Sequence, residues 1–321
     1  MGQGDDRIMS RTIKCLSLGS CGIHIAQNLL MRGGFLSDPF RELGFRRRPL
    51  ALSSGGAVQT YDFCVGERIP PKVLHLAQRE MHQPREETRH LVDESEIALI
   101  ELSTPIEVMI GAVIVNLNLI RTRVVGPLRE STAEPTLVHQ WANALANATE
   151  DLRDRADSLL LDWPRDFVDD GLARFVVEEL SARRLGVDDM VRDLERLRER
   201  LRAPLALQLY TFKYMPDGRA IDWPAGFRAQ QIEVARRLGL PTLDLAAPVA
   251  RLGTKRLIAD DMYHWRPDTK ALQAELTYDF LAGVLGRPGF ETYPESLGIR
   301  REVQARFPEL RDAPASISIA G

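Results

Sequence analysis

The feature that most constrains the fold is an alternation of short apolar runs with stretches of helical periodicity. Residues 12–18 (TIKCLSL) form an apolar, partly β-branched run that ends at Gly19-Ser20. Apolar residues at helical spacing follow and stop at Gly33-Gly34. A strand, a tight turn and a helix in this order are typical of the first unit of an α/β fold.

The same alternation continues through the rest of the chain. We expect further buried strands at 96–103, 205–214 and 241–245, and helices at 72–92, 226–238 and 269–285. Residues 35–65 are predicted to be rich in loops, because prolines and the Ser53-Ser54-Gly55-Gly56 run interrupt them. The predicted fold is a three-layer α/β/α domain over residues 1–285, built on a mostly parallel, doubly wound sheet.

A charged helical segment over residues 121–202 interrupts this pattern and is predicted to be an insertion. Its last part carries an apolar stripe at helical spacing between Val187 and Leu201. A helix that packs on the core would carry such a stripe. The alternative is that the helical segment is a lid or a dimer element, in which case the protein would be a homodimer when the segment dimerises. Residues 286–321 form a tail punctuated by proline and glycine.

Composition excludes several classes of protein. The chain of 321 residues is 44% hydrophobic, which is enough to bury a core, and its net charge of −3 gives no general surface for nucleic acid. The greasiest segment, 108–115, is far shorter than the ~20 residues of a membrane helix. Asp5 and Asp6 stand where a signal peptide carries positive charge, so a cytoplasmic location is expected.

Three cysteines are too few for a disulfide scaffold, which favours a reducing compartment. Cys15 falls inside the first predicted strand and Cys64 in the loop-rich stretch. Cys21 falls at the start of the first predicted helix, where the helix dipole lowers the pKa of a thiol and favours its nucleophilic form. Cys21 is therefore a candidate nucleophile, with Ser20 as its competitor; a small buried cysteine in a tight turn is the structural alternative.

A second short motif, Asp261-Met262-Tyr263-His264, precedes the last predicted helix. A carboxylate three residues before an imidazole can orient that imidazole as a general base. His264 could equally be a histidine of a surface loop. A nucleophile after the first strand and a base before the last helix can meet above one sheet edge. Cys21 and His24 lack two further spaced ligands, so no metal site is predicted.

Gly19-Ser20-Cys21 together with Asp261-x-x-His264 resembles the SGNH/GDSL hydrolase superfamily. More narrowly, the Gly-Ser-Cys turn is similar to capsule-polysaccharide biosynthesis acyltransferase-like proteins. The resemblance implies a flavodoxin-like α/β/α fold, with Cys21 at the position of the nucleophile and with Asp261 and His264 completing the triad.

The resemblance also implies an oxyanion hole, for which Gly22, Gly55 and Ser103 are the candidates; Gly56 is nearly as good a candidate as Gly55. The third conserved sequence motif of the superfamily usually supplies an asparagine to this hole, and that asparagine is missing here. Ser103 could donate in its place. Glu101 could bind a substrate hydroxyl or structure the site, and a strand-end carboxylate paired with an arginine is the alternative for it.

The function that follows is acyl transfer or ester hydrolysis on a hydroxylated metabolite or polysaccharide precursor. A thiol nucleophile forms a thioester that can pass its acyl group to an alcohol, an amine or water. No cofactor is required, and the donor would be an acyl-CoA or an acyl carrier. A Ser20-based esterase and a non-catalytic ligand-binding protein on the same fold are the alternatives.

Overall fold

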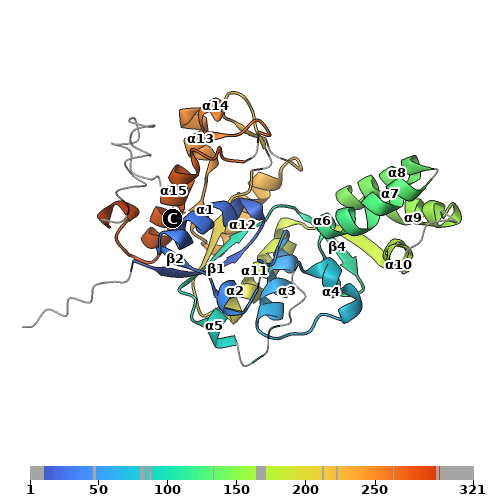
Figure 1. Ribbon diagram of the computed structural model, residues 1–321, viewed down its shortest axis with the longest axis horizontal. Helices are drawn as coiled ribbons and strands as arrows, with labels where there is room; N and C mark the ends of the chain where they lie inside the picture. The colour runs from blue at the N-terminus through green and yellow to red at the C-terminus, as the bar shows by residue number, and fades with distance from the viewer. Residues whose placement is uncertain are drawn as a thin grey trace, which may run out of the picture.

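The core of the molecule is a five-stranded parallel sheet, shown in Figure 1. The structure is a computed structural model, and its strands lie in the order β10-β7-β3-β1-β2. It describes residues 11–45, 48–79, 84, 86, 89–132, 134–163, 171–211, 213–221, 223–262, 264–293 and 296, without the side chain of Cys21. The strands are β1 (Ile13–Leu18), β2 (Leu36–Ser37), β3 (Ile97–Glu101), β7 (Leu205–Gln208) and β10 (Thr242–Leu243).

The three inner strands, β1, β3 and β7, bury side chains on both faces, as expected for a parallel sheet covered by helices. In β1, Leu16 and Leu18 belong to one core cluster and Ile13 and Cys15 to the other. The first cluster also contains residues of three helices, α3 (Ser54–Cys64), α11 (Val187–Arg200) and α12 (Phe227–Leu238). The second contains residues of α1 (Cys21–Arg32), α13 (Ala246–Leu252) and α15 (Lys270–Val284). The predicted three-layer α/β/α architecture is confirmed.

The order of the strands places a topological switch point at β1. The chain moves from β1 outward to β2 and then returns to pair β3 on the other side of β1, all in parallel. In open α/β sheets, ligands bind at the carboxyl ends of the strands beside such a point. The ends of β1 and β3 are therefore where a functional site is expected.

A second, antiparallel sheet and a group of helices lie to one side of the main sheet. The hairpin β4 (Ile106–Ile110) and β5 (Val113–Val115) pairs with β6 (Leu180–Arg184) in the order β5-β4-β6. The helices lie beyond β4 in Figure 1. They are α7 (Gly126–Ser131), α8 (Pro135–Asn147), α9 (Leu152–Leu161) and α10 (Leu172–Glu179).

The last helix of the predicted insertion is part of the main α/β layers. Met190, Leu194 and Leu197 of α11 are buried, and this helix packs against both α3 and α12. The apolar stripe thus covers the core, as the first of the two interpretations expected. A role of the helical segment as a lid or dimer element stays a prediction.

The expectation of a loop-rich stretch at 35–65 is wrong for its second half. Ser54–Cys64 is the buried helix α3, whose first turn contains Gly55 and Gly56. The side-chain oxygen of Ser53 accepts the Gly56 N–H at 3.1 Å and caps this helix. A tertiary contact explains the glycine, since a Cβ at Gly55 would collide with the Glu107 carboxylate.

The remaining elements are short. They are α2 (Pro39–Glu42), α4 (Pro71–Ala77), α5 (Arg89–Asp93), α6 (Leu117–Ile120), a π-helical turn (Arg121–Val125), β8 (Lys213–Tyr214), β9 (Ala220–Ile221), α14 (Thr254–Leu257) and a 3₁₀ turn (Phe290–Thr292). The strand predicted at 205–214 is therefore two separate strands, β7, which ends at Gln208, and the two-residue β8. Among the described helices, none is both long and apolar enough to cross a bilayer.

Candidate active site

The turn after β1 is built around Ser20. Ser20 is the N-cap of α1, and its hydroxyl oxygen accepts the N–H of Gly22 at 3.2 Å. Helix α1 therefore begins at Cys21, as the sequence predicts. Gly19 is required at this turn because a Cβ there would lie 2.8 Å from the Cβ of Glu101.

Glu101 ends β3 and is 2% exposed, directly beside this turn. Its carboxylate accepts a short hydrogen bond from the Ser20 hydroxyl and a second, of 2.6 Å, from the Gln208 side-chain amide. Burial raises the pKa of this carboxyl, while the bonds from Ser20 and Gln208 oppose the shift. The carboxylate thus joins the ends of β1, β3 and β7, and its partners are Ser20 and Gln208 rather than an arginine.

Asp261 and His264 form the predicted pair on the loop between α14 and α15. The Nδ1 atom of His264 lies 2.5 Å from Asp261 Oδ2, and the His264 backbone N–H donates to Asp261 Oδ1 at 2.9 Å. The loop is closed by a bridge between Ile258 and Trp265 and by an Ala259 N–H bond of 2.8 Å to the His264 carbonyl. A proton held on Nδ1 by the carboxylate leaves Nε2 as the basic nitrogen of the ring.

One pocket, which we call the His264 pocket, brings the two motifs together. Its volume is about 420 Å³, including the part open to solvent. Gly22 from α1, Glu101 from β3 and His264 line the same space. The other lining residues are Ile25, Gln208, Leu209, Tyr210, Thr211, Tyr214, Leu245, Trp265 and Gln273.

Gln273 is a polar side chain of this pocket that the sequence did not single out. It lies on α15, is 3% exposed, and its side-chain nitrogen is 3.5 Å from the Gly22 carbonyl oxygen. Its side-chain oxygen is buried and has no hydrogen-bond partner in the described part of the chain. No local motif marks such a residue; only its place on the inner face of α15 does.

The predicted oxyanion donors are engaged with internal partners. The Gly22 N–H bonds to the Ser20 cap, and the Gly56 N–H bonds to the Ser53 cap of α3. Ser103 directs both its backbone N–H, at 2.8 Å, and its hydroxyl, at 3.4 Å, to the carbonyl of Leu52. Gly55, Gly56 and Ser103 do not line the His264 pocket, so their roles there stay predictions.

The three cysteines differ in their surroundings. Cys15 in β1 and Cys64 at the end of α3 are buried free thiols. Burial raises the pKa of Cys15 to about 12 and that of Cys64 well above its usual value, so both stay protonated and unreactive at neutral pH. The side chain of Cys21 lies outside the described groups, and its predicted role as nucleophile is untested by the geometry.

Metal ligation finds no support within the described ranges. No group of three or more histidine, cysteine, aspartate or glutamate side chains there could hold an ion. His24, the second member of the Cys21-x-x-His24 pattern, instead lies with Nδ1 3.1 Å from the Arg48 guanidinium.

One comparison with known proteins identifies the family of the chain. No curated protein and no solved structure matches the chain. Residues 13–279 match the family described as the TviD N-terminal domain, and this range contains both the Ser20 turn and the Asp261–His264 loop. The chain therefore belongs to the TviD N-terminal domain family.

Proposed function

We propose that the protein is an acyltransferase acting on a carbohydrate or another hydroxylated acceptor, with Cys21 as the nucleophile. TviD is a capsule-polysaccharide acetyltransferase, which supports an acyltransferase of this kind for a member of its family. The observation that carries the proposal is the His264 pocket, where Gly22, the neighbour of Cys21, and the Asp261-oriented His264 line one space.

In the first step, the Cys21 thiolate attacks the carbonyl carbon of an acyl thioester donor. A carbon–sulfur bond to Cys21 forms, the bond to the donor sulfur breaks, and the donor leaves as a thiolate that takes up a proton. The position of Cys21 in the first turn of α1 favours the thiolate and supplies N–H groups for the oxyanion. Since Ser20 accepts the N–H of Gly22, those of Cys21 and Ile23 are the nearest first-turn donors.

In the second step, His264 acts as a general base. Its Nε2 takes the proton of an acceptor hydroxyl as that oxygen attacks the acyl-Cys21 carbonyl, and Asp261 stabilises the resulting imidazolium. The Cys21 thiolate leaves and the acceptor carries the ester; the His264 imidazolium then releases its proton to solvent, which restores the enzyme. Water in place of the acceptor would give hydrolysis. In this proposal, Cys21, His264 and Asp261 have the roles of the triad of an SGNH-like enzyme.

The test is the site of acylation. We expect p-nitrophenyl acetate to leave an acetyl group on Cys21 at neutral pH, detected by peptide mass spectrometry, and Cys21→Ala to remove the adduct. The buried thiols of Cys15 and Cys64 should stay unlabelled and serve as internal controls. An adduct on Ser20 would replace the proposal with the Ser20-based esterase, and no adduct at all would favour a non-catalytic binding protein.

Ser20→Ala separates the first two functions. The Ser20 hydroxyl accepts the Gly22 N–H and donates to Glu101, and these contacts support a structural role. We therefore expect Cys21 labelling to persist in this variant. Its free energy of unfolding should fall by about 1–2 kcal/mol, the effect of losing an N-cap, measured by urea denaturation. Loss of all acylation with an intact Cys21 would support the esterase.

A further inference from the structure

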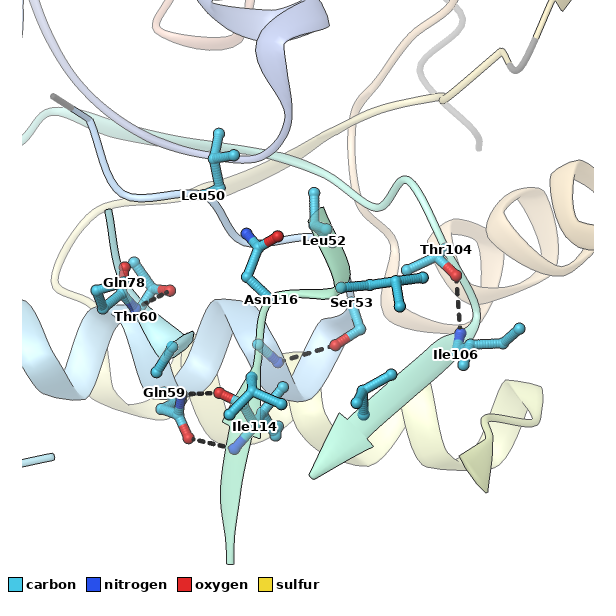
Figure 2. A pocket seen from close by; sticks show the side chains of 15 residues that line it. Leu50, Leu52, Ser53, Gln59, Thr60, Gln78, Thr104, Ile106, Ile114 and Asn116 are labelled. Atoms are coloured by element: carbon cyan, nitrogen blue, oxygen red, sulfur yellow. Dashed lines mark hydrogen bonds between the residues drawn. The ribbon is translucent and has the colours of Figure 1, made fainter. Parts of the chain in front are cut away.

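A second pocket, shown in Figure 2, shares none of its described lining residues with the His264 pocket. Its volume is about 400 Å³, including the part open to solvent. We call it the Gln78 pocket. It is lined by Leu50, Leu52, Ser53, Gly56, Gln59, Thr60, Ala77, Gln78, Thr104, Ile106, Val108, Ile114, Val115, Asn116 and Leu117.

The wall formed by residues 50–53 connects this pocket to the candidate active site. The Ala51 N–H bonds to the Gly19 carbonyl at 3.3 Å, at the turn that precedes Cys21. The Leu52 carbonyl accepts the N–H groups of Ser103 and Thr104, just after Glu101 at the end of β3. A ligand in the Gln78 pocket would therefore lie beside the turn that carries the proposed nucleophile.

The polar groups of the pocket are mostly satisfied by the protein itself. Gln59 exchanges two hydrogen bonds, of 2.7 and 2.8 Å, with the backbone of Ile114, as Figure 2 shows. Ser53 caps α3 and donates to Glu107 at 3.0 Å, and Thr104 accepts the Ile106 N–H at 3.0 Å. These side chains shape the pocket and need no ligand.

Gln78 is the exception. It is 1% exposed, and its side-chain nitrogen donates to the Thr60 hydroxyl at 3.2 Å. Its side-chain oxygen is buried and has no hydrogen-bond partner among the described residues. Most buried acceptors in folded proteins have a hydrogen-bond partner, so a ligand N–H or an ordered water would complete this one.

The lining defines the chemistry of that donor. Among the described residues that line the pocket there is no ionisable side chain and no aromatic ring, and most of them are aliphatic. A charged group would lose its hydration there without a partner. The His264 pocket differs, because Tyr210, Tyr214 and Trp265 give it the aromatic surfaces that suit a sugar ring.

We infer that the Gln78 pocket binds an uncharged secondary amide on an aliphatic chain, the chemistry of the pantetheine arm of an acyl thioester donor. The amide N–H donates to the Gln78 side-chain oxygen, and the flanking methylene groups contact the aliphatic wall. This inference rests on the proposed function and deepens it, since it gives the donor and the acceptor separate pockets. Gly22 lines one of them, and the residue 50–53 wall of the other bonds to Gly19.

Binding can be measured without turnover in the Cys21→Ser variant, so the result does not depend on the identity of the nucleophile. We expect calorimetry to detect pantetheine binding, and hydrogen exchange to slow in 74–78 and 113–117 when pantetheine is present. No binding at concentrations up to about 10 mM would overturn the inference and leave an ordered water as the partner of Gln78. Protection confined to other segments would overturn it as well.

Substitution of Gln78 tests the contact itself. In the same Cys21→Ser background, Gln78→Met should raise the Kd of pantetheine about five- to tenfold, the loss of one hydrogen bond. Gln140→Met makes the same change on α8, far along the chain from the pocket lining, and should leave the Kd unchanged. Equal effects of the two substitutions would contradict the inference.

The pantetheine arm could belong to coenzyme A or to an acyl carrier, and comparing the affinities for coenzyme A and for pantetheine distinguishes the two. An affinity for coenzyme A well above that for pantetheine would identify a nucleotide-bearing donor that makes further contacts. Equal affinities would identify the arm as the recognised part, as a carrier-bound donor requires. Failure of acylation at Cys21 would reject the proposed function, while the binding result would stand by itself.

Discussion

The two halves of the candidate site differ in how deeply they are set in the protein. Ser20, Glu101 and Gln208 are 7%, 2% and 4% exposed and connect three strands of the sheet. The side chains of Asp261 and His264 are 49% and 41% exposed on a loop. The buried half is part of the core, so changes there should alter stability; changes in the exposed half should alter activity alone.

The largest effect is expected for the exposed half. His264→Asn should lower the rate of acyl transfer by about 10²–10⁴-fold, the usual contribution of a general base. The free energy of unfolding should stay within about 0.5 kcal/mol of the wild type, because the side chain is exposed. Steady-state kinetics and urea denaturation measure the two quantities.

His139→Asn provides the matched control for this variant. His139 is an exposed histidine on α8 whose ring bonds to Asn143 at 2.9 Å. Its substitution should change neither rate nor stability. A large loss of stability in His264→Asn would show that the loop is as much part of the core as the Ser20 turn, and the contrast between the halves would fail.

The buried half should respond in the opposite way. Glu101→Ala removes the acceptor of the Ser20 hydroxyl and of the Gln208 amide and leaves both donors buried. We expect the free energy of unfolding to fall by about 2–4 kcal/mol in urea denaturation. Glu199→Ala, an exposed glutamate on α11, should change it by less than about 0.5 kcal/mol. Unchanged stability in Glu101→Ala would remove the structural role assigned to this carboxylate.

A smaller effect concerns pH and His24, one turn after the Ser20 cap on α1. Burial and the neighbouring Arg48 guanidinium lower the pKa of His24 to about 3, so it stays neutral in the folded protein. The unfolded chain binds a proton at His24 near pH 6.5, so stability is full above that pH and is lost as the pH falls. Between pH 6.5 and 5.5, we expect a loss of up to ~1.4 kcal/mol per pH unit.

Urea denaturation across this pH window measures the effect, and His24→Asn should flatten the dependence. Asp38 contacts the same Arg48, and burial raises its pKa, so it acts in the opposite direction. A folded acid with a raised pKa keeps its proton longer than the unfolded chain and adds stability as the pH falls. An identical slope in the wild type and in His24→Asn would show that His24 does not titrate differently on unfolding.

Local patterns predicted the elements that have a clear period and clear ends. The first strand and helix, the strand at 96–103, and the helices at 226–238 and 269–285 are all found within a few residues of their predicted limits. Each has a clear apolar pattern and ends at a glycine, a cap or a polar residue. The Asp261–His264 pair was also predicted, because three residues of spacing suffice to bring a carboxylate to an imidazole.

Helix α3 and the second sheet were not predicted, and the reason lies in contacts that are distant in sequence. The glycines of α3 suggest a loop locally, yet the Glu107 carboxylate leaves no room for a Cβ at Gly55. Strand β6 pairs with β4 although their paired residues lie 70 to 78 positions apart in the sequence. Only the folded chain shows either reason.

The sequence alone determined the alternation of strands and helices around the main sheet and the two motifs, because both depend on neighbours within a few residues. The tertiary structure decided what those motifs meet. It paired Glu101 with Ser20 and Gln208, placed Gly22 and His264 in one pocket, and left the Gln78 oxygen buried without a partner among the described residues. These contacts join residues up to some 240 positions apart. A local sequence pattern does not show which distant residues a parallel sheet brings together at one edge.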